Sequence, residues 1–350
     1  MTQLKEPEFT DERSRLVFTD GGAVLPAFGC LLAFWLLLLS SCAGTVGEQA
    51  AGDASTAACT SELRYLYSFG SSGTMPGQFR SPSSVRIDPF QSLLVADTGN
   101  NRIQKLDASG RFMMEFGAPG SSEASLDRPT DCAANGLSIY VVDSVNERIL
   151  EFDGDGRFLS VCVSSEGLSD RFASFKPRNI AFSQTGYVFV SDADADALVV
   201  FSRFWDPITV VGGFGAGEGR FRQPGGMAPD ARGDLFVCDT GNGRLQVLSS
   251  TGNFLEWIPV CAGEPECEPS DVAAGPDGLL YVADPGSGRV MVLGQDGSAR
   301  CEVHAVNGER LVRPCSVAVS QNGLVYVLDG GSDEVHVFQT SGSGPAPDAR

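Results

Sequence analysis

Short apolar runs, separated by turns rich in glycine, recur along most of the chain. Six of these runs end in aspartate, and a proline precedes each aspartate by 14 or 15 residues. The runs occupy residues 93–97, 139–143, 188–192, 235–239, 280–284 and 325–329. Their aspartates lie 45 to 49 residues apart, so two markers keep the same register in every unit. This regularity indicates one supersecondary unit that is repeated six times.

Each unit predicts four short strands. The apolar run is the second strand, a turn leads to a third strand such as residues 102–106, and a glycine-containing turn leads to a fourth such as residues 112–116. Four strands in about 46 residues are typical of a β-propeller blade. The second strands are apolar at consecutive positions, as expected of strands packed between two neighbouring blades.

The two ends of the repeat region predict how the ring closes. The sixth unit stops after its third strand at residues 335–338, and a segment with the character of a fourth strand precedes the first unit at residues 63–69. Pairing the two would close the ring and remove its exposed edges. We therefore predict an all-β, six-bladed β-propeller over residues 61–340, with an N-terminal strand closing the last blade. The tail at 341–350 is rich in Gly, Ser and Pro and is expected to be loose.

An apolar stretch at residues 23–39 precedes the repeats. As a helix it would span about 25 Å, which is short for a bilayer core and fits the apolar segment of a signal peptide. The next residues, Leu39-Ser40-Ser41-Cys42, resemble the lipobox of bacterial lipoproteins. The resemblance implies a signal peptide over 1–42, lipidation of Cys42 and a flexible tether over 43–60. The alternative is an uncleaved signal-anchor that crosses the membrane once.

The lipobox resemblance also implies where the protein is located, and the location decides whether its cysteines can form disulfides. Ala43 after the lipidated cysteine is similar to the enterobacterial signal for the outer membrane, so we expect a lipid-anchored protein of the bacterial envelope, facing the periplasm or the exterior. Exported proteins can form disulfides. Two candidate pairs would staple links between successive blades: Cys261 with Cys267, and Cys301 with Cys315.

The charge balance argues against one class of partner. The chain has 44 acidic and 25 basic residues, for a net charge of −19 at pH 7. Such a surface repels phosphate backbones, so we expect no nucleic-acid ligand.

Two segments carry a family resemblance. Residues 95–104 (VADTGNNRIQ) and 237–246 (VCDTGNGRLQ) resemble the NHL repeat. This family forms six-bladed propellers that usually bind proteins, carbohydrate or RNA. Its RNA-binding members use a basic face, which the acidic composition does not favour. The resemblance therefore implies a protein, peptide or glycan ligand.

Four units place an arginine five residues after the aspartate, across a hairpin where the two side chains can meet. We predict structural ion pairs at Asp97/Arg102, Asp143/Arg148, Asp239/Arg244 and Asp284/Arg289. Units three and six, which are opposite in a ring of six, have Ala197 and Glu334 instead of arginine.

The turns of units three and six are also acidic. One hypothesis is that they attract a cation, Ca²⁺ above all, or a basic partner; the alternative is that they are merely solvated. The residues concerned are Asp192, Asp194, Asp196, Asp329, Asp333 and Glu334.

Catalysis finds little support in the sequence. His304 and His336 are the only histidines, too few for a three-histidine zinc centre. The sequence also contains no Gly-x-Ser-x-Gly, phosphate-loop or HExxH motif. We predict no catalytic residue, no cofactor and no definite metal site, and we expect a binding or scaffold module.

The alternative function is a metal-assisted lyase or lactonase with its site at the central channel, since propellers host both binding and catalysis. Three or more convergent His, Asp, Glu or Asn side chains at the channel would favour that enzyme.

Overall fold

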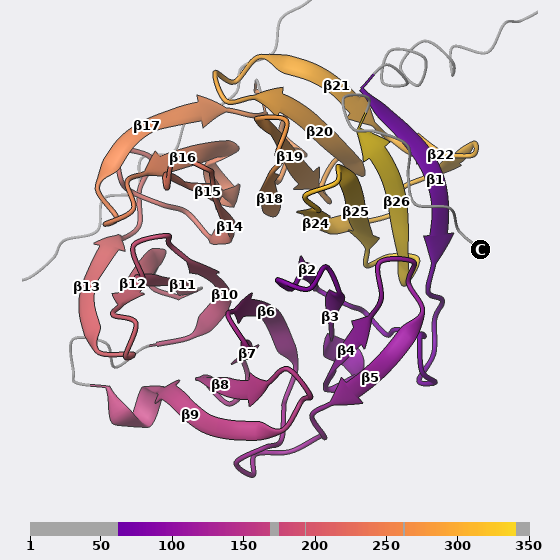
Figure 1. The fold of residues 1–350 in the computed structure, drawn as a ribbon. Coiled ribbons are helices and arrows are strands. Elements are labelled where there is room, and N and C mark those ends of the chain that lie inside the picture. The colour runs from indigo at the N-terminus through magenta and orange to yellow at the C-terminus, as the bar shows by residue number, and fades with distance from the viewer. Residues whose placement is uncertain (1–61, 169–174, 193, 262, 341–350) are drawn as a thin grey trace, which may run out of the picture. The chain divides into compact units, whose positions relative to one another are not determined.

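The computed structural model describes residues 62–168, 175–192, 194–261 and 263–340. These residues form six four-stranded antiparallel sheets around a central axis, so the predicted all-β, six-bladed propeller is confirmed (Figure 1). The predicted signal peptide, lipobox, tether and C-terminal tail lie outside the described residues. Within the described segments, no helix has the length and apolar character needed to cross a membrane.

In each blade the first strand lies at the channel and the fourth at the outer edge. Blade one is β2 (Ser84–Ile87), β3 (Leu93–Asp97), β4 (Arg102–Leu106) and β5 (Phe112–Phe116). Blade two is β6 (Pro129–Asn135), β7 (Ser138–Asp143), β8 (Arg148–Asp153) and β9 (Phe158–Ser164). Blade three is β10 (Pro177–Phe182), β11 (Val188–Asp192), β12 (Ala197–Phe201) and β13 (Pro207–Gly212).

The second half of the ring continues the pattern. Blade four is β14 (Pro224–Pro229), β15 (Leu235–Asp239), β16 (Arg244–Leu248) and β17 (Phe254–Pro259). Blade five is β18 (Asp271–Ala274), β19 (Leu279–Asp284), β20 (Arg289–Gly294) and β21 (Ala299–Val303). Blade six is β24 (Pro314–Val319), β25 (Leu324–Asp329), β26 (Glu334–Thr340) and β1 (Leu63–Phe69). A small hairpin joins blades five and six, formed by β22 (Ala305–Val306) and β23 (Glu309–Arg310). Single 3-10 turns occur at Thr98–Asn100, Ser165–Gly167 and Thr240–Asn242.

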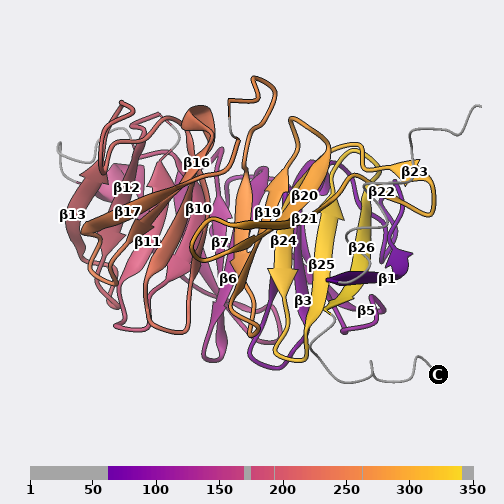
Figure 2. The same ribbon diagram turned by 90° about the horizontal axis from the view of Figure 1, so that it is seen from above.

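The hydrophobic core lies between the blades. Because successive side chains of a strand point to opposite faces, each inner strand contributes to two interfaces. In β3, Leu93 and Val95 pack in a cluster with Tyr326 of blade six. Leu94 packs in another cluster, with Val141 of blade two. This packing explains the apolar residues at consecutive positions of the second strands. Seen edge-on, the strands cross the thickness of the ring and the connecting loops gather on its two faces (Figure 2).

Blade six is completed by the N-terminal strand, as the sequence predicts. β1 pairs antiparallel with β26, from Leu63 opposite Thr340 to Phe69 opposite Val335. In Figure 1 the indigo strand lies beside the yellow one at the right of the ring. Tyr65 adds an edge-to-face contact with Phe338, with ring centroids 5.6 Å apart. The strand therefore covers the outer edge that β26 would otherwise expose.

The repeat aspartates are buried, with at most 2% of each residue exposed. In every blade the carboxylate accepts a backbone N–H from the connection that enters the blade, one or two residues before its proline. The donors are the N–H groups of Arg80, Asp127, Lys176, Arg222, Glu268 and Arg313, at 2.7–3.1 Å. Each aspartate therefore ties the incoming chain to the end of the second strand. This bond accounts for the aspartates of blades three and six, which face no arginine.

The four predicted Asp/Arg combinations are ion pairs in the structure, with Nε to Oδ2 distances of 2.7–3.0 Å. In blade one, Arg102 also donates through Nη2 to the carbonyl oxygens of Met75 and Gln78. The arginine thus adds a second tie to the same incoming connection.

The cysteines differ in part from the expectation. Cys261 and Cys267 form a disulfide. The predicted pairing of Cys301 with Cys315 is wrong, because Cys301 is disulfide-bonded whereas Cys315 is a free thiol. The reason is radial position: Cys301 lies on the outermost strand of blade five and Cys315 on the innermost strand of blade six. Proximity in sequence across a blade junction hid this separation.

Replacing Asp192 by Ala is expected to destabilise the protein even though no arginine faces Asp192. The change leaves three backbone N–H groups, of Lys176, Asp194 and Ala195, without their acceptor, at a cost of about 3 kcal/mol. Asp194→Ala in the same turn removes a half-exposed ion pair with Lys176 and should cost less than about 1 kcal/mol. Urea unfolding of both variants measures the difference; equal losses would contradict this role for the buried aspartate.

Candidate functional site

The innermost strands line the central channel, and one position on them breaks the repeat. Four residues after the repeat proline, blade one has Arg86, and the other five blades have alanine. The alanines are Ala133, Ala181, Ala228, Ala273 and Ala318, and all five line one cavity together with Arg86. Arg86 on β2 is therefore the one long side chain at this level of the channel.

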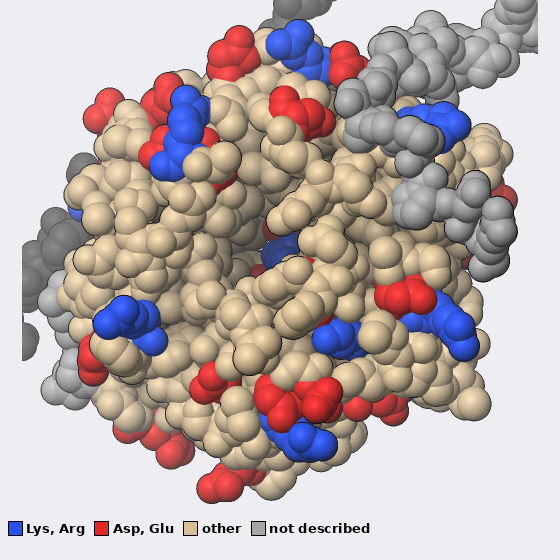
Figure 3. Space-filling model, in the orientation of Figure 1, with Lys and Arg blue, Asp and Glu red and all other residues tan. Residues whose placement is uncertain are grey.

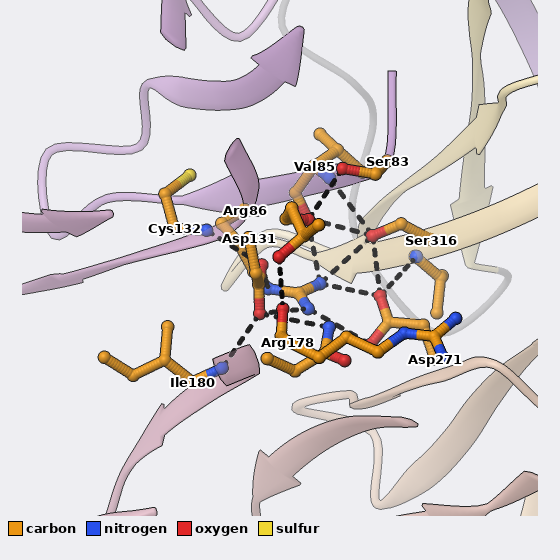
Figure 4. A network of polar contacts seen from close by, with 12 residues as sticks. Ser83, Val85, Arg86, Asp131, Cys132, Arg178, Ile180, Asp271 and Ser316 are labelled. Atoms are coloured by element: carbon orange, nitrogen blue, oxygen red, sulfur yellow. Dashed lines mark hydrogen bonds and ion pairs between the residues drawn. The ribbon is translucent and has the colours of Figure 1, made fainter. Parts of the chain in front are cut away.

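Arg86 is held by carboxylates from two other blades (Figure 4). Its Nε lies 3.1 Å from Asp131 on β6, and its Nη1 lies 2.6 Å from Asp271 on β18. Nη2 donates to both carboxylates, at 3.1 and 3.2 Å. Nη1 also donates to the hydroxyl of Ser316 on β24, at 3.1 Å. One guanidinium thus joins blades one, two, five and six at the axis.

The remaining blades take part through the same carboxylates. Asp131 accepts the backbone N–H of Ile180 in blade three at 3.1 Å and a longer contact from the Asn179 amide at 3.3 Å. Asp271 lies so close to Gly226 of blade four that a Cβ there would meet Oδ1 at 1.9 Å. Glycine is therefore required in blade four to make room for Asp271, and the other five blades supply the polar contacts of the plug.

The electrostatics of the plug follow from burial. Burial raises the pKa of Asp131, Arg86 lowers it, and the nearby Asp271 carboxylate raises it, with a net upward shift. Burial alone would lower the pKa of Arg86, but Asp131 and Asp271 raise it above its ordinary value, so the guanidinium stays charged. Two carboxylates share one cation, and this cation fills the place between them that a metal ion would need.

On one side of the plug lies a polar cavity of about 370 Å³. Arg178 of blade three and Arg313, which precedes blade six, line it and are exposed. Neither guanidinium has an ion-pair partner among the described residues. Glu268 is the acidic residue of the lining, and the hydroxyl groups come from Ser83, Thr130, Thr240 and Ser270.

The connections around this mouth carry further cations. Arg80, Arg128 and Arg222 are exposed in the segments that enter blades one, two and four. Arg222 stacks on Phe214, with its Cζ 5.2 Å from the ring centroid, and none of the three forms an ion pair with a described residue. The rim of the polar cavity is thus richer in unpaired cations than the net charge of −19 suggests.

On the other side of the plug the channel is apolar. This cavity, of about 300 Å³, is lined by the alanine ring and by side chains such as Ile180, Phe182 and Met227, and Arg86 is its single charged lining residue. Figure 3 views this face: its centre is hollowed, and a basic side chain is visible at the floor. The plug therefore separates two mouths of opposite character.

The acidic turns of blades three and six lie away from the axis and bind backbone groups. Asp196 accepts the N–H of Gln223 at 2.6 Å, and Asp333 accepts the N–H of Ser81 at 2.7 Å. Asn101 of blade one does the same for Arg128, so the acidic residues occupy an ordinary place in the repeat. Among the described residues, no group of three or more His, Cys, Asp or Glu side chains is arranged to hold a metal ion. The geometry thus lends the calcium hypothesis no support in this part of the chain.

The two histidines are remote from the channel. His304 follows β21 and lies 3.0 Å from Glu302 on the outermost strand of blade five. His336 on β26 packs beside Tyr65, with ring centroids 6.4 Å apart. The groups that do converge at the axis are Asp131 and Asp271, which bind Arg86, and Asn179, whose side-chain amide contacts Asp131. Sequence reasoning missed this set, although the single arginine among five alanines marks its position.

Comparison with known proteins agrees with this architecture. Residues 221–248, in blade four, match the NHL repeat family model. A segment of 72 residues is 40% identical to Protein brain tumor of Drosophila melanogaster and covers 21% of this chain but 7% of that protein. B-box type zinc finger protein ncl-1 of Caenorhabditis elegans is 43% identical over 54 residues, 15% of this chain and 6% of that protein. The matched part is therefore a small fraction of either relative.

Solved structures show the same fold at low identity. A streptogramin B lyase is similar over 80% of this chain and 98% of its own, with a TM-score of 0.58 and 14% identity. The PQQ-bound aldose sugar dehydrogenase of Streptomyces coelicolor covers 79% of this chain and 98% of its own, with a TM-score of 0.54 and 13% identity. At these identities the likeness concerns the fold alone. The chain is thus a six-bladed β-propeller with a recognisable NHL repeat.

Replacing Arg86 by Met is expected to lower the free energy of unfolding by about 3 to 5 kcal/mol at pH 7, because two buried carboxylates lose their cation. A carboxylate with a raised folded-state pKa destabilises the fold above that pKa, and protonation relieves the effect. The deficit should therefore shrink as the pH falls from 7 to 5. Urea unfolding at both values measures it. Arg178→Met, at the exposed mouth, should change stability by less than about 0.5 kcal/mol; a pH-independent deficit in the Arg86 variant would contradict the assignment.

Proposed function

We propose that this chain is a non-catalytic binding module that recognises a protein, peptide or glycan on the face of the polar cavity. The observation that carries the proposal is the occupied axis of the channel: Arg86 neutralises Asp131 and Asp271, and above it lies a polar surface with unpaired arginines. Hydroxyl groups and guanidinium groups at a concave mouth are suited to orient a polar ligand.

A lyase or lactonase with a channel metal is less well supported. Such an enzyme needs carboxylate or imidazole groups that are free to bind the metal or to transfer protons. The oxygens of Asp131 and Asp271 accept hydrogen bonds from Arg86, from Ser316 and from backbone N–H groups, and both histidines lie elsewhere. Structural likeness to a lyase at 14% identity adds no catalytic residue.

The charge pattern indicates which ligands suit the mouth. Arg178 on blade three and Arg313, just before blade six, flank the cavity from opposite sides of the ring and favour a ligand with anionic groups. A long nucleic acid would extend past this rim over a molecule with a net charge of −19, so we retain the expectation that nucleic acid is not the partner. A short anionic or polar ligand fits both charges.

Lipidation of Cys42 would hold the module at a bacterial membrane, most simply the outer membrane, as the lipobox resemblance implies. The module would then sample ligands in the periplasm or at the cell exterior.

The double variant Arg178→Ala/Arg313→Ala is expected to weaken ligand binding at least tenfold and to reduce its dependence on salt, because two charges at the mouth are lost. The measurement is calorimetric titration of the full chain with hits from a panel of acidic, neutral and basic peptides and glycans. The control is Arg111→Ala/Arg300→Ala, which removes the same charge from the turn before β5 and from strand β21. Equal losses in both variants, or turnover of a panel compound, would contradict the proposal.

Replacing Cys42 by Ser should abolish incorporation of labelled fatty acid in a bacterial host and release the protein from the membrane fraction. Cys30→Ser, inside the proposed signal peptide, is the control and should leave labelling unchanged. Retention of the Cys42→Ser variant in membranes at its full length would favour the signal-anchor instead.

A further inference from the structure

The repeat arginines of blades one and five each hold a second carboxylate, on the outermost strand. Arg102 Nη1 lies 2.6 Å from Glu115 on β5, and Arg289 Nη1 lies 3.0 Å from Glu302 on β21. Both glutamate side chains are partly exposed, at 42% and 36%. In these two blades, Nη1 of the repeat arginine therefore binds a carboxylate at a partly solvent-exposed position.

Blade four has the same arginine but lacks this carboxylate. Trp257 pairs with Gln246 across β16 and β17 just as Glu115 pairs with Gln104 across β4 and β5, so Trp257 takes the place of the glutamate. Arg244 keeps its other bonds, from Nε to Asp239 and from Nη2 to two carbonyl oxygens. Among the described residues, Arg244 Nη1 has no hydrogen-bond partner.

The residue that takes the place of the glutamate, Trp257, is an exposed aromatic ring next to Arg244 Nη1. Trp257 is 48% exposed, and the Cζ atom of Arg244 lies 5.5 Å from its ring centroid. The exposed part of the indole is a flat apolar surface, and the Arg244 guanidinium lies over the ring as a fixed cation. A ligand that meets both needs an apolar ring face with a carboxylate attached directly to it.

These groups line a groove of about 640 Å³ with a preformed wall. The wall includes Gly263, Glu264 and Pro265, from the loop that the Cys261–Cys267 disulfide closes. Glu264 ties this loop to blade five through a 2.6 Å ion pair with Arg289, which also binds Asp284 and Glu302. A wall fixed before the ligand arrives lowers the entropic cost of binding.

We propose that this groove binds a sugar residue that bears a carboxylate, such as a uronate within an acidic glycan. The carboxylate takes the place on Arg244 Nη1 that glutamate takes in blades one and five, and the apolar face of the sugar ring lies against Trp257. An aspartate or glutamate of a peptide carries its carboxylate on a flexible stem and brings no ring face, so the sugar is the better match. The inference rests on the proposed binding function and specifies its ligand.

The groove is continuous with the proposed binding face. Thr240 and Glu268 line both this groove and the polar cavity at the channel mouth. A glycan chain with one acidic residue on Arg244 can therefore extend its neighbouring sugars toward Arg178 and Arg313. Glu268, at the junction, accepts hydrogen bonds from sugar hydroxyls.

The test is calorimetric titration of the full chain with a galacturonate trisaccharide, a neutral galactose trisaccharide and a triglutamate peptide. The unsubstituted protein is expected to bind the galacturonate at least tenfold more tightly than either other probe. Trp257→Glu should abolish this preference without lowering the melting temperature, because its own carboxylate pairs with Arg244 as Glu115 pairs with Arg102. Trp257→Ala, which keeps Nη1 free but removes the ring, should weaken galacturonate binding about tenfold.

Glu115→Trp in blade one is the matched control: it frees Arg102 Nη1 where no disulfide loop forms a wall, and it should leave galacturonate binding within twofold. Undiminished binding by Trp257→Glu, or equal affinity for the neutral trisaccharide, would overturn the groove assignment. Tighter binding of triglutamate would overturn the choice of a sugar. If Trp257→Glu changes nothing while Arg178→Ala/Arg313→Ala weakens a panel ligand, the groove fails and the proposed binding face stands.

Discussion

The propeller depends on one recurring interaction: a buried carboxylate that accepts a backbone N–H from the chain entering its own blade. It is present in all six blades, with or without the arginine that marks the repeat. The incoming connection runs between blades, so the bond sets where each new sheet begins. An unpaired buried N–H or carboxylate is costly, and this cost makes the aspartate hard to replace. The arginines and the acidic turns are additions to this frame.

At the axis, too, buried carboxylates are stabilised by the groups that they bind. The carboxylates of Asp131 and Asp271 would be strongly unfavourable alone, and Arg86 is the cation that makes them tolerable. The plug divides the channel, and it leaves the polar mouth as a surface for recognition. Blade four shows the reverse case, in which an arginine nitrogen is left without its carboxylate and an aromatic ring stands beside it. Departures from the repeat, judged against blades that keep it, thus locate both the plug and the groove.

Much of the fold was predictable because its determinants are local and repeated. Aspartate and proline in register gave the number of blades, and residues 63–69 were identifiable as the missing strand. The channel network was not predictable, because Arg86, Asp131 and Asp271 are far apart in sequence and meet only when the ring closes. The error at Cys301 and Cys315 has the same origin: sequence spacing says nothing of radial depth within a blade. The backbone partners of Asp196 and Asp333 also escaped notice, since main-chain donors leave no signature in a sequence.

Because the first strand closes the ring, the topology affects when each molecule can finish folding. Leu63 pairs with Thr340, so blade six cannot be completed until nearly the whole chain has been synthesised. Contacts between residues so distant in sequence form slowly. The polypeptide is therefore expected to stay unfolded for longer than a protein whose contacts are mostly local. An unfolded chain is the form that can pass through a narrow secretion pore. The topology that closes the finished ring thus also delays its closure, which would suit the export proposed for this chain.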